Sequence, residues 1–334
     1  MAQIPEPLVD RIGQQCAESI LTAVYEHDLP PVIDELMPAY QTLKASRPRF
    51  IWKWVHHLAP SNTLPCVDAD YRETVPIDKT IAILYITLLD DVLEQCGDRA
   101  TFAELRKLPD PHATADPEAA GVDADYVDFA DRVWTLLIDR LQRGPTYSRY
   151  EELFRFDIRQ GITAIEYSDL AIRQPELATM ADIERYESHN MVMFAYADID
   201  LMYTTREMTT EIGTIRDAVH HAQRMARIGN WVSTWERELR DGDYSSAIVV
   251  YALEHDILTP AELPDTPASE PETLDAIADR LRQAEIEQQF LDRWDDHYDA
   301  LCQINETDAA IDLTPYIDGT EEVLRYHIAS TGLK

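Results

Sequence analysis

The stretch "IAILYITLLDDVLEQC", residues 81–96, begins as an apolar run and ends in acids. Its apolar residues Ile81, Leu84, Tyr85 and Leu88 recur at steps of three and four residues. Side chains with this spacing lie on one face of an α-helix, so the stretch predicts a helix that is buried along that face.

The same period recurs through most of the chain, and only ten glycines interrupt its 334 residues. A second set of apolar positions with helical spacing comprises Ile212, Ile215, Val219, Ala222 and Met225. The pattern predicts an all-α fold, an antiparallel helical bundle formed by one domain over residues 1–334. Two stretches rich in Pro, Asp and Ala, 108–124 and 258–272, are expected to be surface loops within this domain.

The composition limits the classes of partner. Lys and Arg number 29 against 62 Asp and Glu, which gives a formal net charge of -33. Such a charge repels nucleic acid and anionic membrane surfaces, so neither is an expected partner. The acid-rich, lysine-poor surface is typical of proteins that stay soluble at high salt, and we expect a halophilic source.

The location of the protein is inferred from its cysteines and its apolar runs. The four cysteines are scattered and form no CxxC pair, and the chain does not begin with a charged and then apolar signal sequence. These features favour a cytoplasmic protein. No apolar run reaches the roughly 18 residues that a membrane-spanning helix needs. The oligomeric state is left open, a homodimer included.

The acids that end the opening stretch form the pattern DDxxE. On an α-helix Asp90 and Glu94 lie one turn apart and project together, while Asp91 points about 100° away around the axis. Carboxylates this close repel one another, so either they face water or a cation neutralises them. The motif alone leaves both readings open.

A second set of oxygen ligands lies in "IGNWVSTWERELRDGD", residues 228–243. Asn230, Thr234 and Glu238 are spaced four residues apart, so an amide, a hydroxyl and a carboxylate share one helix face. These hard ligands suit Mg²⁺, which is usually held by one or two carboxylates together with phosphate oxygens. A polar helix face with accidental spacing is the alternative.

Together the two motifs resemble those of the class I terpene synthases of bacteria and fungi. That family pairs an aspartate-rich motif with a downstream helix that carries the pattern (N/D)D-x-x-(S/T)-x-x-(K/R)-E. The matching residues of this chain are Asp90, Asp91 and Glu94, and then Asn230, Thr234, Arg237 and Glu238. The chain departs from the pattern at Trp231, where the family usually has an aspartate that is not a metal ligand.

The resemblance implies an activity and a cofactor. It implies that three Mg²⁺ ions, with Mn²⁺ as a substitute, stabilise the diphosphate of a linear prenyl substrate of 15 or 20 carbons as its C–O bond ionises. The carbocation would then cyclise. The resemblance further implies that Arg185 senses the diphosphate and that the pair Arg325 and Tyr326 covers it. Arginine suits this role because its planar fork donates paired hydrogen bonds to phosphate oxygens.

Aromatic side chains are candidates for lining the substrate pocket, because a cation above a π face is stabilised by about 0.5–2 kcal/mol. Each of them is also accounted for as an ordinary core residue, since aromatic side chains fill helical cores. The candidates are Tyr85, Phe194, Tyr196 and Trp231, with Trp52 and Trp54 further off.

Two other functions compete with the cyclase. Asp295, Asp296 and Asp299 form a literal DDxxD, and chain-elongating prenyl transferases carry two such motifs. An elongase also needs a second basic phosphate site, for which the segment before Asp90 offers only Arg72 and Lys79 among several acids. We therefore interpret the second acidic cluster as a solvated helix face. A non-catalytic helical binding protein with a degenerate pocket is the remaining alternative.

Other enzyme classes lack their motifs. The sequence has no GxSxG, no GxxxxGK(S/T) and no GxGxxG, and its histidines lie on no HExxH or similar zinc spacing. We therefore expect no transition metal, no nucleotide cofactor and no serine nucleophile of the common kinds.

Overall fold

A computed structural model describes residues 14–264, 269–307 and 311–333. Within these ranges the secondary structure is helical and no strand occurs, which confirms the predicted all-α fold. The α-helices are α2 (Gln14–Glu26), α3 (Pro31–Asp34), α4 (Met37–Tyr40), α5 (Arg49–Leu58), α6 (Thr74–Asp90), α7 (Arg99–Leu105), α8 (Ala124–Leu141), α9 (Tyr147–Arg173), α10 (Met180–Arg185), α11 (Met193–Met202), α12 (Ile212–Asp241), α13 (Ala247–Glu254), α14 (Pro271–Gln283), α15 (Ile286–Thr307) and α16 (Thr314–Ala329).

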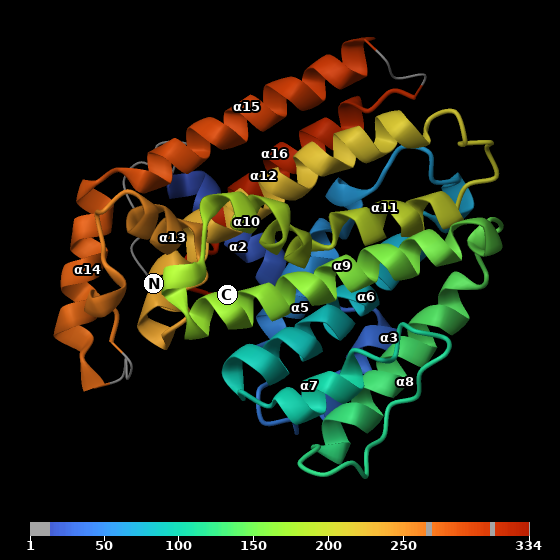
Figure 1. The fold of residues 1–334 in the computed structure, drawn as a ribbon. Helices are drawn as coiled ribbons and strands as arrows, with labels where there is room; N and C mark the ends of the chain where they lie inside the picture. Colours follow the sequence, from blue (N-terminus) through green and yellow to red (C-terminus); the bar gives the residue numbers. More distant parts are fainter. Residues whose placement is uncertain (1–13, 265–268, 308–310, 334) are drawn as a thin grey trace.

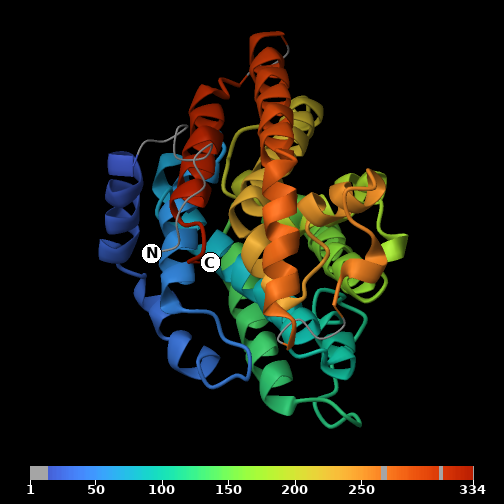
Figure 2. The ribbon, with the colours of Figure 1, turned by 90° about the vertical axis from the view of Figure 1, so that its left-hand side faces the viewer.

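Two helices organise the bundle (Figure 1). The longest, α12, packs against α11, α13, α14, α15 and α16, whereas α6 packs against α5, α8, α9 and α11. The N-terminal helix α2 lies beside α5 and α16, so the two ends of the described chain are neighbours (Figure 2). Helix α11 contacts both α6 and α12, which brings the helices that carry the two predicted motifs into one part of the fold.

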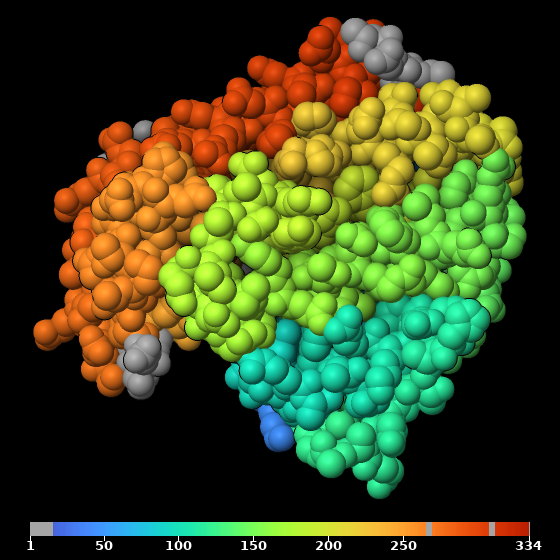
Figure 3. Space-filling model, in the orientation of Figure 1, coloured from blue at the N-terminus to red at the C-terminus, as the bar shows by residue number. Residues whose placement is uncertain are grey.

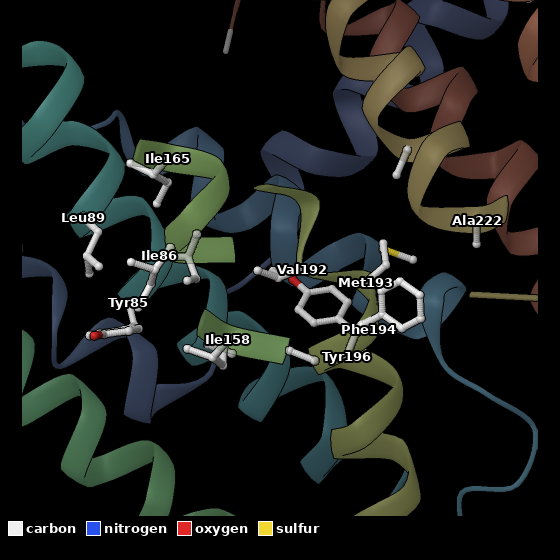
Figure 4. Packing of buried hydrophobic residues seen from close by; sticks show 14 of the residues in the cluster. Tyr85, Ile86, Leu89, Ile158, Ile165, Val192, Met193, Phe194, Tyr196 and Ala222 are labelled. Carbon is white, nitrogen blue, oxygen red and sulfur yellow. The ribbon is translucent and has the colours of Figure 1, made fainter. Parts of the chain in front are cut away.

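The apolar face predicted from the spacing is buried. Ile81, Leu84, Tyr85 and Leu88 are at most 1% exposed. Figure 4 shows the neighbouring part of the core, where side chains of α6, α9 and α11 meet. The hydrophobic effect stabilises such a helix far more than its intrinsic propensity does, which explains why the period of apolar residues predicts the fold class so directly.

The predicted loops coincide with breaks between helices. Residues 106–123 contain no helix and connect α7 to α8. Between α13 and α14 the chain forms a short 3₁₀ turn, Pro260–Glu262, and Pro271 begins α14 inside the second predicted loop. Residues 265–268 of that loop lie outside the described residues. The division of the chain into domains stays a prediction.

Helix α16 crosses the 3₁₀ turn η1 (Ala59–Asn62) at a glycine. A Cβ atom built on Gly319 would lie 1.8 Å from the backbone oxygen of Ser61, so the two backbones meet without room for any side chain. Gly213, near the start of α12, has no such neighbour within 4 Å.

These two glycines give a matched test of the packing. Gly319→Ala is expected to lower the free energy of unfolding by about 1–3 kcal/mol or more, because backbone must move to admit the methyl group. Gly213→Ala is expected to leave it unchanged or to raise it by up to about 1 kcal/mol, because alanine is the better helix former. Chemical denaturation measures both. Equal effects of the two substitutions would contradict the close crossing of α16 and η1.

On the face shown in Figure 3, α9 and α10 lie between α13 and α14 on one side and α7 and α8 on the other. Within the described parts of the chain, no helix is both long enough and apolar enough to cross a bilayer.

Candidate active site

The first acidic motif lies where α6 changes its hydrogen-bonding pattern. The α-helix ends at Asp90, and Asp91–Gln95 continue as a π-helical turn, η3, in which the N–H of Cys96 donates to the carbonyl of Asp91 at 3.1 Å. The regular α-helical spacing expected between Asp90 and Glu94 is therefore wrong in detail. A π turn widens the helix, and such turns often occur at functional sites.

Asp91 is the most enclosed of the three acids. It is fully buried, and its Oδ1 accepts hydrogen bonds from Arg47 Nε at 2.8 Å and from Gln95 Nε2 at 2.6 Å. The hydroxyl of Tyr40 lies 3.5 Å from Oδ2. Burial is the main cause that raises the pKa of Asp91, to about 6, while Arg47 opposes the shift.

Asp90 shares the partner Arg47 with Asp91, but its second partner is a residue of a different segment. Its Oδ2 accepts from Arg47 Nη2 at 2.6 Å, and its Oδ1 accepts from Asn190 Nδ2 at 3.4 Å. Asn190 lies on the 3₁₀ turn η5 (Glu187–Met191), which joins α10 to α11. Of the surface of Asp90, 9% is accessible to solvent, whereas Asp91 has no accessible surface.

The second motif lies on the C-terminal half of α12, as its spacing predicts. Asn230 and Glu238 are partly exposed, and Thr234 between them is buried. The Thr234 hydroxyl donates to the carbonyl of Asn230 at 2.7 Å, which leaves the lone pairs of the hydroxyl oxygen available to a cation. Asn230 Oδ1 accepts from Arg227 Nη1 at 2.5 Å.

Arg227 and η5 connect the two motifs. Arg227 is 8% exposed, and its guanidinium forms an ion pair with Glu187, which is fully buried on η5. The same turn contacts the first motif through Asn190. The segment Glu187–Met191 therefore hydrogen-bonds to the first motif directly and is linked to Asn230 of the second motif through Arg227.

Carboxylates of both motifs interact electrostatically with Arg227. Burial raises the pKa of Glu94 well above its usual value, and the charges of Asp90 and Asp243 raise it further, while Arg227 opposes them. Burial and Asp243 likewise raise the pKa of Glu238 to about 7. Glu94 and Glu238, far apart in sequence, thus share the neighbours Asp243 and Arg227.

This donor set fits a divalent cation bound together with a phosphate-bearing substrate. In the described residues, no three side chains of His, Cys, Asp or Glu are gathered closely enough to hold a metal ion alone. Mg²⁺ rarely uses such an all-protein cage, because it keeps waters and binds through one or two carboxylates plus substrate phosphates. Burial is the main cause that raises the pKa of Glu94 and of Glu238, and neighbouring acids raise both further, so a cation bound here would favour the ionised form of each carboxyl group.

The structure places the predicted diphosphate-binding arginines apart from these contacts. Arg185, at the end of α10, is exposed, and its guanidinium lies 5.3 Å from the ring centre of Tyr186. Arg325 is half exposed on α16 and pairs with Glu321 one turn earlier. Tyr326 is buried and its hydroxyl lies 2.8 Å from His57 Nε2. Their roles toward a diphosphate stay predictions.

The predicted aromatic residues are buried, except for the partly buried Trp54, but they point in different directions. Tyr85 packs against Trp134 of α8 and donates to the carbonyl of Leu105, and so belongs to the core between α6, α7 and α8. Phe194 and Tyr196 lie together on α11 (Figure 4). Trp231 packs edge-on against Phe290 of α15. Of the two candidates named as further off, Trp52 packs against Tyr40 and Trp54 packs against His327.

The rival acidic cluster is solvated. Asp295, Asp296 and Asp299 are exposed on α15, in agreement with their interpretation as a helix face. Asp295 borders a surface hollow of about 250 Å³ between α15 and α16, which Arg325 also lines. Neither predicted metal motif lines this hollow.

Sequence reasoning missed four residues that shape the site. Arg227 lies three residues before Asn230, so the helical spacing already placed both on one face. Asp243 closes the quoted motif stretch, but lies beyond the end of α12. Glu187 lies in no recognisable motif, and no signal in the sequence identifies it as a partner of Arg227. Arg47 is 43 residues from Asp90 in sequence, and no local pattern announces their contact.

Comparison with known proteins adds few matches. No protein-family model matches the chain, and no curated protein sequence matches it. Among solved structures, farnesyl diphosphate synthase from T. brucei is similar, with 11% sequence identity and a TM-score of 0.49 over 98% of this chain and 99% of that chain. The same enzyme complexed with bisphosphonate BPH-722 gives 11% and 0.48 over 95% and 97%. At such low identity and scores, we draw no conclusion about activity from either match.

Proposed function

We propose that this protein is a Mg²⁺-dependent enzyme that ionises a linear prenyl diphosphate of 15 or 20 carbons, and that it is a terpene synthase which cyclises the resulting carbocation. One observation carries the proposal: Glu94 of η3 and Glu238 of α12 both interact electrostatically with Arg227 and Asp243, and Arg227 also donates a hydrogen bond to Asn230. Bound Mg²⁺ would act as a Lewis acid on the oxygens of the leaving diphosphate.

The residues of this chain would divide the work. Asp90 and Glu94 from the first motif, and Asn230, Thr234 and Glu238 from the second, are the side chains we assign to the cations. Arg227 would hold Asn230 in place through its 2.5 Å hydrogen bond. The largely buried surroundings of the acids limit the access of water and strengthen the charge interactions among them.

The second candidate function is chain elongation, and one observation favours it. Arg47 is not among the basic residues counted in the segment before Asp90, yet it lies directly against Asp90 and Asp91. Lys44, on the same connection, is exposed and pairs with Asp123. Lys79, however, is fully buried and paired with Asp200, which removes it from the basic residues available to a second diphosphate. The exposed Asp295–Asp299 cluster offers no second acidic motif beside the first.

A single set of incubations tests both functions. Purified protein in high-salt buffer receives Mg²⁺ and either farnesyl or geranylgeranyl diphosphate, with and without isopentenyl diphosphate, and the hexane extract is analysed by gas chromatography with mass detection. We expect a hydrocarbon or alcohol from one prenyl substrate alone, with release of diphosphate that stops in excess EDTA. Turnover that persists in EDTA would overturn the metal-dependent mechanism.

The isopentenyl diphosphate arm separates the two candidates. A cyclase should give the same product with or without it. A longer prenyl diphosphate that forms only in the mixed incubation would identify an elongase instead.

A further inference from the structure

Arg47 donates hydrogen bonds to one carboxylate oxygen of each aspartate in the first motif. Its Nη2 donates to Asp90 Oδ2 at 2.6 Å and its Nε donates to Asp91 Oδ1 at 2.8 Å, so one guanidinium bridges both aspartates. The other oxygen of Asp90 accepts from Asn190. Both oxygens of Asp90 are therefore already engaged by protein donors.

The segment that carries Arg47 is fastened in place. Its backbone N–H donates to the hydroxyl of Tyr40 at 2.7 Å, and the N–H of Ala45 donates to the hydroxyl of Tyr126 at 2.8 Å. Tyr40 is fully buried and Tyr126 nearly so. The contact between Arg47 and the aspartates is therefore built into the fold and is not a chance meeting of surface side chains.

The two aspartates differ in how accessible their carboxylate oxygens are to a cation. Asp91 is fully buried and accepts from Arg47 and Gln95, so a cation would have to break buried hydrogen bonds to reach it. Asp90 is linked to Arg47 through Nη2 and has 12% of its side chain exposed. A cation that approaches the motif meets Asp90 first, and meets the positive charge of Arg47 there.

We propose that Arg47 competes with divalent cations for Asp90, and that Asp91 is a positioning residue that holds Arg47 in place and is not a metal ligand. This inference rests on the proposed function. Its consequence is an order of binding: the cation gains Asp90 only when further negative charge, such as that of the substrate diphosphate, accompanies it. Loss of a positive charge in hydrogen-bond contact with a ligand strengthens that ligand's attraction for a cation.

The test measures the binding of Mn²⁺ alone, without any prenyl substrate. Chelator-treated wild-type protein and Arg47→Gln are titrated with Mn²⁺, and free Mn²⁺ is followed by its electron paramagnetic resonance signal. We expect Arg47→Gln to bind Mn²⁺ about tenfold more tightly than the wild type. Arg49→Gln is the matched control, because Arg49 lies two residues away and pairs with Asp34 instead; its affinity should equal that of the wild type.

The outcomes are distinct. Equal or weaker Mn²⁺ binding by Arg47→Gln overturns the inference, as does the same increase in Arg49→Gln. Absence of Mn²⁺ binding in every variant also overturns the inference, whereas the metal-dependent function is overturned only by turnover that persists in EDTA. Arg47→Gln leaves Asp91 buried without the guanidinium that neutralises it. If this variant fails to fold for that reason, the double variant Arg47→Gln/Asp91→Asn is compared with Asp91→Asn. The tenfold difference in Mn²⁺ affinity is then expected between those two variants.

Discussion

Glu238→Gln is expected to lower turnover by roughly a hundredfold to a thousandfold, the loss that follows removal of one group that stabilises developing charge. The amide has the shape of the carboxyl group but lacks its charge, so the cation loses the negative charge of this ligand while the packing of α12 is kept. Helical content, measured by circular dichroism, should be unchanged. The steady-state rate of diphosphate release measures the loss.

The matched control is Asp295→Asn. It makes the same chemical change on an exposed face of α15, and turnover should stay within about twofold of the wild type because surface substitutions rarely perturb the fold. A native circular dichroism spectrum with a dead Asp295→Asn and an active Glu238→Gln would place the metal site on α15.

The same carboxylate gives a pH dependence. Because burial and Asp243 raise the pKa of Glu238 to about 7, a part of its population is protonated near neutrality and cannot ligate a cation. Metal affinity of the wild type should therefore rise as the pH is raised toward and beyond 7, and Glu238→Gln should lose this part of the profile.

Lys79→Met is expected to lower the free energy of unfolding by about 3–5 kcal/mol, because it leaves Asp200 in the core without its partner. Lys79 Nζ lies 2.8 Å from Asp200 Oδ2 and also donates to the carbonyl of Asn62 at 2.7 Å, and both charged side chains are fully buried. Burial lowers the pKa of Lys79 and raises that of Asp200 to about 6, while the pairing opposes both shifts.

Urea denaturation followed by circular dichroism measures this effect. The double variant Lys79→Met/Asp200→Asn removes both charges and should recover part of the loss, since replacement of a whole buried pair costs far less than removal of one partner. Arg280→Ala, which breaks an exposed pair with Glu262, should change the free energy of unfolding by less than about 1 kcal/mol. A loss in Lys79→Met no larger than in Arg280→Ala would contradict the buried pair.

The sequence predicts the fold class because burial follows a local period. Ile81 and Leu88 are two turns apart, and their common face is buried as their spacing requires. The second motif was equally predictable, since Asn230 and Glu238 lie on one uninterrupted helix. Wherever the chemistry follows from positions on one helix, the spacing alone is informative.

The rest depends on contacts between distant segments and on local departures from ideal geometry. Arg47 reaches Asp91 from a different part of the chain, and no spacing of apolar residues indicates that Glu187 is fully buried. The basic residues named for a possible second phosphate site included Lys79, whose position in the core no period discloses. Tertiary contacts of this kind are not encoded by any spacing along the sequence.

The π turn at Asp91–Gln95 has a consequence for how the chain tolerates insertion and deletion. A hydrogen bond that reaches back five residues instead of four accommodates one more residue in the turn than an α-helix would. Deletion of Val92 would allow the turn to close as an ordinary α-helix, and the side chains beyond it, Glu94 included, would keep roughly their present directions relative to Asp90, because the π turn absorbs the one residue that is lost. In chains that lack this additional residue, an acid four residues after the first would face a different neighbour, and the spacing between the first acid and the last would have to shorten by one for the same two carboxylates to meet Arg227.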